Sequence, residues 1–232
     1  PMILGGDGER LSKRHGAVSV TQYKDDGYLP EALLNYLARL GWSHGDDELF
    51  SMAQFIEWFD VAHINRSPAQ FNEDKLRWVN SQYIRQSPPD TLRRAVVERL
   101  GPIDDSAWLD TAINAYRDRS DTLNALADAI QSHRELAPID TTLLTAHLTP
   151  DVRPAIIALQ GLLAQADWTK DAIKAAIKQT LHEFNLKMPL IAMPMRVMLL
   201  GKTHTPSVDT VILLTGRDAT LKRMSEALAL TA

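Results

Sequence analysis

Cysteine is absent from this sequence, so it can form neither disulfide bonds nor thiolate metal sites. Long apolar runs are absent too, since no stretch approaches the roughly 18 residues that a membrane-spanning helix needs. The first residues include Gly5, Gly6 and Gly8 and lack the basic and apolar regions of a signal peptide. These absences fit a cytoplasmic protein that makes no membrane contact. Because the sequence begins at Pro1 without an initiator methionine, we expect it to be cut from a larger protein.

An excess of positive charge is also missing. The formal net charge is -4, which argues against a generally basic nucleic-acid binder. Contact with phosphates needs only a local field, however, and two stretches provide one. Residues 10–24 hold four basic residues and no acid, and residues 185–208 hold three basic residues and no acid. Taken alone, either stretch is equally well explained as a chance fluctuation along a helical protein.

Helix signals dominate the 232 residues, because apolar side chains recur at three- and four-residue spacing between capping residues. Proline and glycine delimit one helix at Pro30 and Gly41, Ser51 and Gln54 form a capping box, and Asn72 begins another helix. The fold class predicted is mainly α. The expected helices cover residues 30–40, 51–59, 72–83, 89–100, 106–116, 121–130, 152–163, 169–184, 190–200, 207–215 and 218–230, with a looser segment at 137–150.

Short connections between amphipathic helices favour antiparallel neighbours, so we divide the chain near residues 83 and 131. The predicted parts are residues 1–83, a small bundle at 84–131 and a second bundle at 132–232.

The sharpest local motif is Arg10-Leu11-Ser12-Lys13-Arg14, which follows the glycine-rich entry. On its residues alone, such a basic loop is more often a solvated surface. It resembles the KMSKS loop of class I aminoacyl-tRNA synthetases in the form usual for the glutamate enzymes. The resemblance implies that residues 10–14 bind ATP and that Lys13 is catalytic, stabilising the charge that develops as pyrophosphate leaves. A flexible cationic loop suits this role because it acts by electrostatic stabilisation of the transition state.

Further segments resemble glutamyl-tRNA synthetases in order and spacing: residues 27–37, 40–43, 71–72, 75–76 and 78–80. In that family this region is a helical stem-contact domain, which touches the inner side of the L-shaped tRNA. Considered one by one, Tyr36, Trp42 and Trp78 are explained simply as core residues.

Residues 193–201 and the turn Thr205-Pro206-Ser207-Val208 resemble the family's anticodon-binding helical bundle. The resemblance implies that Arg196, Thr205, Pro206 and Val208 hold the first anticodon base. Unpaired loop bases can be read on their edges, which an arginine beside an apolar shelf can do. Without the resemblance, Arg196 would be interpreted as a surface arginine at a helix start.

Residues 117–123, Arg-Asp-Arg-Ser-Asp-Thr-Leu, resemble the family segment whose second arginine contacts the third anticodon base. Arg119 is therefore a candidate, and arginine there favours cytosine in the family. A role in capping the helix that begins at Asp121, or plain solvent exposure, remains an equal alternative. We predict no metal site, because His44 with Asp46, Asp47 and Glu48 lacks metal-site spacing.

The resemblance as a whole implies a glutamate–tRNA ligase that uses ATP with Mg²⁺, glutamate and glutamate tRNA through a glutamyl-adenylate. We expect this piece to be monomeric, to bind no cofactor by itself and to be catalytically inactive, because the nucleotide-binding sheet is not in it. One alternative is a helical scaffold that binds only protein. A glutaminyl enzyme would have β-barrels in the anticodon region, and the shortened relative that modifies aspartate tRNA would lack residues 84–232.

Overall fold

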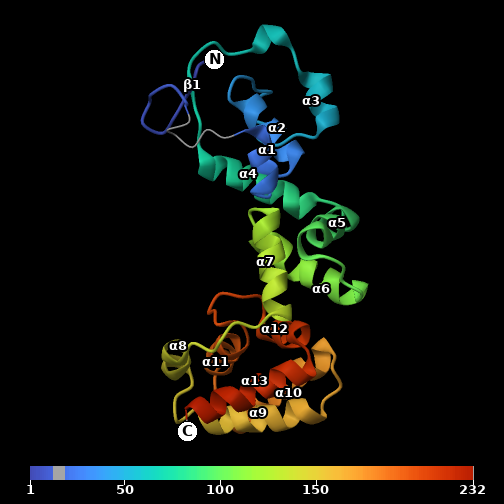
Figure 1. Ribbon diagram of the computed structural model, residues 1–232, viewed down its shortest axis with the longest axis vertical. Helices are drawn as coiled ribbons and strands as arrows, with labels where there is room; N and C mark the ends of the chain where they lie inside the picture. The colour runs from blue at the N-terminus through green and yellow to red at the C-terminus, as the bar shows by residue number, and fades with distance from the viewer. Residues whose placement is uncertain (13–18, 232) are drawn as a thin grey trace. The chain divides into compact units, whose positions relative to one another are not determined.

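Helices form most of the structure, a computed structural model that describes residues 1–12 and 19–231. The predicted mainly α fold class is confirmed. The chain divides into two compact units, residues 1–128 and 129–232, and the boundary falls within α7 (Leu123–Arg134) (Figure 1). The three-part division drawn from the sequence stays a prediction. Among the described residues, no helix has both the length and the apolar character needed to cross a membrane.

The first unit begins with a two-stranded parallel pairing, in which Ile3 lies opposite Ala69 and Leu4 opposite Gln70. Its elements in chain order are β1 (Ile3–Leu4), α1 (Val20–Asp25), α2 (Pro30–Arg39), α3 (Met52–Trp58), the 3-10 turn η2 (Val61–His63), β2 (Ala69–Gln70), α4 (Glu73–Gln86), α5 (Pro89–Leu100), α6 (Ser106–Tyr116), the 3-10 turn η3 (Arg117–Arg119) and the first part of α7.

Helix starts in the first unit follow from local chemistry. Ser51 accepts a hydrogen bond from the amide of Gln54, whose side chain accepts one from the amide of Ser51, so the predicted capping box is present. Asn72 likewise accepts from the amide of Lys75 and caps α4. Each cap satisfies backbone donors that the first turn of a helix leaves without partners.

The core of the first unit lies where α2 packs on α4 (Figure 1). Leu33, Tyr36, Leu76 and Val79 are buried there, and removing such side chains from water is the main driving force for the packing. Buried Asn35 ties the connection after α2 to this core, since it donates to the carbonyl of Glu48 and accepts from the amide of Phe50. Aromatic rings of Trp42, Phe50, Phe55 and Phe59 pack around that connection.

The second unit is an all-helical bundle among its described residues. Its elements are the end of α7, α8 (Thr141–His147), α9 (Arg153–Gln165), α10 (Lys170–Glu183), α11 (Met188–Leu200), α12 (Val208–Thr215) and α13 (Arg217–Leu230). One apolar cluster drawn from α8 to α13 forms its core, with Ile156, Leu159, Ile177, Met195 and Met224 almost fully buried. Helices α11 and α12 are apolar on most sides, so most of their side chains are buried, and they pack on each other and on α10 and α13.

The structure corrects three local predictions. Helix α8 lies within the segment expected to be looser, and Asp140 caps it by accepting from the amide of Leu143. Helix α7 begins two residues after Asp121, and Thr122 caps it by accepting from the amide of Ala125. Helix α1 was not expected, because Val20–Asp25 is too short to show an apolar period.

Candidate nucleic-acid interface

The predicted ATP-binding loop follows a tight reversal of the chain after β1. Gly5 donates its amide to the carbonyl of Glu9 at 2.8 Å. Gly8 has a φ of +81°, a left-handed conformation that glycine adopts without steric cost. Arg10 then returns beside Leu4 in an antiparallel bridge.

The part of this loop that the structure describes is exposed. Arg10 and Ser12 face solvent, Leu11 is half-buried, and the amide of Leu11 donates to the carbonyl of Ile3 at 2.9 Å. Lys13 and Arg14, the remaining members of the predicted ATP-binding set, lie outside the described residues. The role of residues 10–14 therefore stays a prediction.

Arg119 closes the 3-10 turn η3 in the first unit, and its side chain is exposed. Its neighbours Tyr116 and Ser120 are buried, and the Ser120 hydroxyl donates to the carbonyl of Tyr116 at 3.0 Å. Burial raises the pKa of Tyr116 to about 12, although the positive charge of Arg119 acts to lower it. The cap of α7 is Thr122, so Arg119 is not needed to cap that helix.

Arg196 lies on α11 in the second unit and is half-buried against the following turn. Its guanidinium donates to the carbonyl of Thr203 at 3.5 Å and to the carbonyl of Pro206 at 3.3 Å. A contact of 3.8 Å joins it to the sulfur of Met193. Its Nε is buried and has no hydrogen-bond partner among the described residues. The structure therefore brings Arg196 and the predicted turn together, and Arg196 holds the turn by its backbone.

The other members of this set are buried rather than presented to solvent. Thr205, Pro206 and Val208 are all buried, and the Thr205 hydroxyl donates to the carbonyl of Pro206 at 2.9 Å. Val208 begins α12 and belongs to the apolar core. These residues therefore shape the turn, while the exposed side chains on it are those of Lys202, His204 and Ser207. Arg119 belongs to the first unit and Arg196 to the second.

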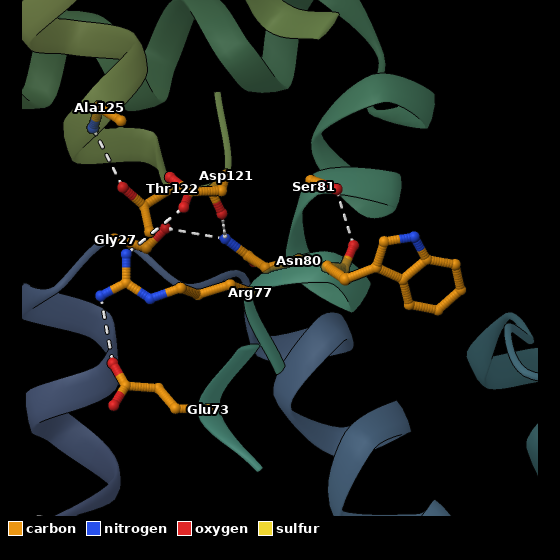
Figure 2. A network of polar contacts seen from close by, with 9 residues as sticks. Gly27, Glu73, Arg77, Asn80, Ser81, Asp121, Thr122 and Ala125 are labelled. Atoms are coloured by element: carbon orange, nitrogen blue, oxygen red, sulfur yellow. Dashed lines mark hydrogen bonds and ion pairs between the residues drawn. The ribbon is translucent and has the colours of Figure 1, made fainter. Parts of the chain in front are cut away.

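Sequence reasoning missed a buried polar network in the first unit (Figure 2). The side chain of Asn80, fully buried on α4, accepts from the amide of Leu29 at 2.8 Å. It donates to the carbonyl of Asp121 at 2.6 Å and to that of Gly27 at 3.4 Å. Arg77, one turn earlier, pairs with both Glu73 and Asp121. The signal available beforehand was an asparagine on the apolar face of a helix, a position that requires hydrogen-bond partners.

Acidic residues in the connection after α2 form ion pairs. Glu48 pairs with Lys75 at 2.8 Å and with Arg39 at 3.4 Å, and these cations lower the pKa of its carboxyl, with the Lys75 hydrogen bond as the largest cause. His44 stacks on Trp58 with ring centroids 4.2 Å apart. Within residues 1–12 and 19–231, no group of three or more potential ligands is arranged to hold a metal ion.

Two family models match the chain. Residues 94–228 match the anticodon binding domain, and residues 1–78 match the catalytic domain of class I tRNA synthetases for glutamate and glutamine. Arg119, Arg196 and the turn at 205–208 fall in the first match, and residues 10–14 fall in the second.

Relatives of known name cover almost the whole chain. The chain is 48% identical over 238 residues to a glutamate–tRNA ligase of Burkholderia vietnamiensis, which covers 99% of this chain and 50% of the relative. It is 50% identical over 233 residues to the corresponding ligase of Herminiimonas arsenicoxydans, covering 98% of this chain and 50% of that protein. The chain thus spans about half the length of these relatives.

A solved structure of a glutamate tRNA ligase from Elizabethkingia meningosepticum, in complex with its amino acid, has a similar fold. The TM-score between the two structures is 0.85 and the sequence identity is 24%. The match covers 98% of this chain and 50% of that chain. At this identity the likeness shows the fold alone, whereas the relatives and the family models show ancestry. The chain belongs to the anticodon-binding-domain family and is homologous to the C-terminal half of glutamate–tRNA ligases.

Proposed function

We propose that this chain is the tRNA-reading part of a ligase that attaches glutamate to glutamate tRNA through a glutamyl-adenylate, with ATP and Mg²⁺ as the longer protein's requirements. The observation on which this rests is the exposed Arg119 on its fixed 3-10 turn, inside the residues that match the anticodon binding domain. Such a ligase acts in the cytoplasm, where translation uses its product, and we expect the chain to be monomeric.

Arg119 contacts the third anticodon base in this proposal. An arginine offers several donors in a fixed planar arrangement, so it can pair with two acceptors on the edge of one unstacked base. Exposure of Arg119 beside the buried Tyr116 and Ser120 supports this role, because the side chain can reach solvent while its backbone is held.

Arg196 and the turn at Thr205, Pro206 and Val208 hold the first anticodon base. Arg196 stabilises the turn through the carbonyls of Thr203 and Pro206, so the turn offers a preformed backbone to a base. A preformed site loses less conformational entropy on binding than a flexible loop would.

The basic loop, residues 10–14, binds the phosphates of ATP in the longer ligase, and Lys13 stabilises the charge on the departing pyrophosphate. The match of residues 1–78 to the synthetase catalytic domain supports this assignment. The chain alone is catalytically inactive, because the reaction of glutamate with ATP requires the other half of the longer ligase.

A titration of the chain with glutamate tRNA and with a non-cognate tRNA at several salt concentrations tests the proposal. Tighter binding to glutamate tRNA that weakens as salt rises is expected, because phosphate contacts release counterions. Equal and feeble binding to both RNAs would contradict it and would favour a helical scaffold that binds only protein. An adenylation assay on the chain, with glutamate and ATP, should give no product.

A further inference from the structure

Arg117, two residues before Arg119, contacts the end of α4. Its Nη2 donates to the backbone carbonyls of Ile84 at 3.1 Å, Arg85 at 2.5 Å and Ser87 at 2.7 Å. The last carbonyls of a helix have no partners within the helix and carry a partial negative charge. The Nη2 atom of Arg117 bonds three such carbonyls at once, of which that of Ile84 also accepts the amide of Ser87, and these bonds hold the guanidinium at the end of α4.

The rest of the turn is bonded to the same helix. Arg85 on α4 donates in return to the carbonyl of Asp118 at 2.9 Å. Asn80, also on α4, donates to the carbonyl of Asp121 at 2.6 Å (Figure 2). Backbone atoms on both sides of Arg119 are thus fixed to α4, while the Arg119 side chain extends into solvent.

We propose that Arg117 is a positioning residue, which sets the direction of Arg119 by binding the turn to α4. This inference rests on the proposed function, because it assigns Arg119 to the third anticodon base. Reading a base edge requires a side chain held close to the productive geometry, and a mobile turn would let Arg119 contact several bases equally. Arg117 touches no base in this scheme and acts only through Arg119.

The competing explanation is that Arg117 does nothing more than cap α4. Both explanations predict that its removal destabilises the chain, so stability cannot separate them. Selectivity can, because a cap alone would leave the ratio of affinities for two tRNAs unchanged. The ratio that matters compares glutamate tRNA with the same tRNA carrying uracil instead of cytosine as the third anticodon base.

The experiment measures this ratio by fluorescence anisotropy for the whole 232-residue chain and four variants, well below their melting temperatures. The variants are Arg117→Met, Arg117→Lys, Arg119→Gln and Arg217→Met. Arg217 is the matched control, because its guanidinium donates to the carbonyls of Ala164 and Ala166 at the end of α9 in the second unit. Arg117→Lys retains the charge, but the lysine side chain is one bond shorter, so its ammonium does not reach the position of Nη2. It replaces Arg117→Met if that variant does not fold.

We expect Arg119→Gln to lower the ratio about tenfold, the usual size of one arginine–base contact. Arg117→Met or Arg117→Lys should lower it at least about threefold. Arg217→Met should lower the melting temperature without changing the ratio.

A ratio that stays at the wild-type value in both Arg117 variants, while Arg119→Gln lowers it, would overturn the positioning role and leave the proposed function standing. If the wild-type chain itself does not prefer glutamate tRNA to a non-cognate tRNA, the proposed function fails, and this inference fails with it.

Discussion

The side-chain amide of Asn80 donates a 2.6 Å hydrogen bond to the backbone carbonyl of Asp121, which lies 41 residues further along the chain. Asn80 also binds the amide of Leu29 and the carbonyl of Gly27, so one buried side chain of α4 is bonded to two other backbone segments. The segment at Gly27 follows α1, and the segment at Asp121 leads into α7. Asn80 thus links α4 to the connection after α1 and to the segment before α7.

Replacing Asn80 with alanine should lower the free energy of unfolding by about 3 kcal/mol, because buried backbone groups lose their partners. Urea unfolding followed by circular dichroism measures this. Asn114, exposed on α6, is the matched control, and its replacement with alanine should change stability by less than about 0.5 kcal/mol. Equal losses in the two variants would show that the Asn80 network contributes nothing.

Gly27→Ala should destabilise the chain by about 3 kcal/mol, because it adds both strain and a close contact. Gly27 has a φ of +89°, and a Cβ there would lie 2.7 Å from the backbone nitrogen of Asn124. Gly45 separates the two effects, since its φ is +52° but nothing lies within 4 Å of an added Cβ. Gly45→Ala should therefore cost only about 1 kcal/mol. Similar melting temperatures for the two variants would mean that the approach of Asn124 is not tight.

His133 should make the stability of the chain depend on pH. It is buried in the second unit and hydrogen-bonded to Thr215, and burial, assisted by nearby Lys202, lowers its pKa from 6.5 to about 4. Below pH 6.5 His133 is protonated in the unfolded chain, whereas in the folded chain it stays neutral down to about pH 4. Stability due to neutral His133 is therefore complete above pH 6.5 and is lost as the pH falls toward 4.

At pH 5 this loss should reach about 2 kcal/mol relative to pH 7.5. The measurement is urea unfolding at both pH values for the wild type and for His133→Gln, which has no titrating ring. The difference between the two proteins isolates the histidine from carboxyl groups that titrate in the same range. If both lose the same stability, His133 does not have the lowered pKa.

Arg196→Lys should loosen the turn at residues 202–207, because a single ammonium cannot span the carbonyls of Thr203 and Pro206. Amide hydrogen exchange in this turn should accelerate about tenfold, which corresponds to the loss of one or two net hydrogen bonds. Affinity for glutamate tRNA should fall as well, although the charge is retained.

The control for Arg196→Lys is Arg153→Lys, since Arg153 also donates to carbonyls in the second unit, those of Leu228 and Thr231. It should lower stability without accelerating exchange at residues 202–207. If exchange in the turn is unchanged in Arg196→Lys, the turn is stable without the arginine.

Helix positions were predictable where the determinants are local. The range Pro89–Leu100 was predicted to the residue, because Pro89 occupies the first turn and Gly101, with a φ of +77°, follows the last. The same holds for Ser106–Tyr116. Helix α8 was missed because its one fully buried side chain, Leu144, leaves too weak an apolar period in a seven-residue helix.

The candidate site was only partly predictable. Arg119 and Arg196 were chosen from their sequence context, yet nothing in the sequence indicated that Arg196 holds the carbonyls of its own turn. Arg117 received no role, because its partners at the end of α4 lie 30 to 33 residues earlier. Residues 10–14 remain as the sequence left them, since the structure describes only the first three.

The sequence alone determined the mainly helical fold, most helix ends and the family resemblance, because capping residues, prolines and apolar spacing act over a few residues. The tertiary structure decided which polar side chains are exposed and which serve the backbone. Asn80, Arg117 and Arg196 are all polar, and each bonds backbone groups outside its own helix or turn, which for Arg196 are those of the turn that follows α11. A buried polar group must find partners wherever the fold places them, and that requirement becomes visible only when the chain has folded.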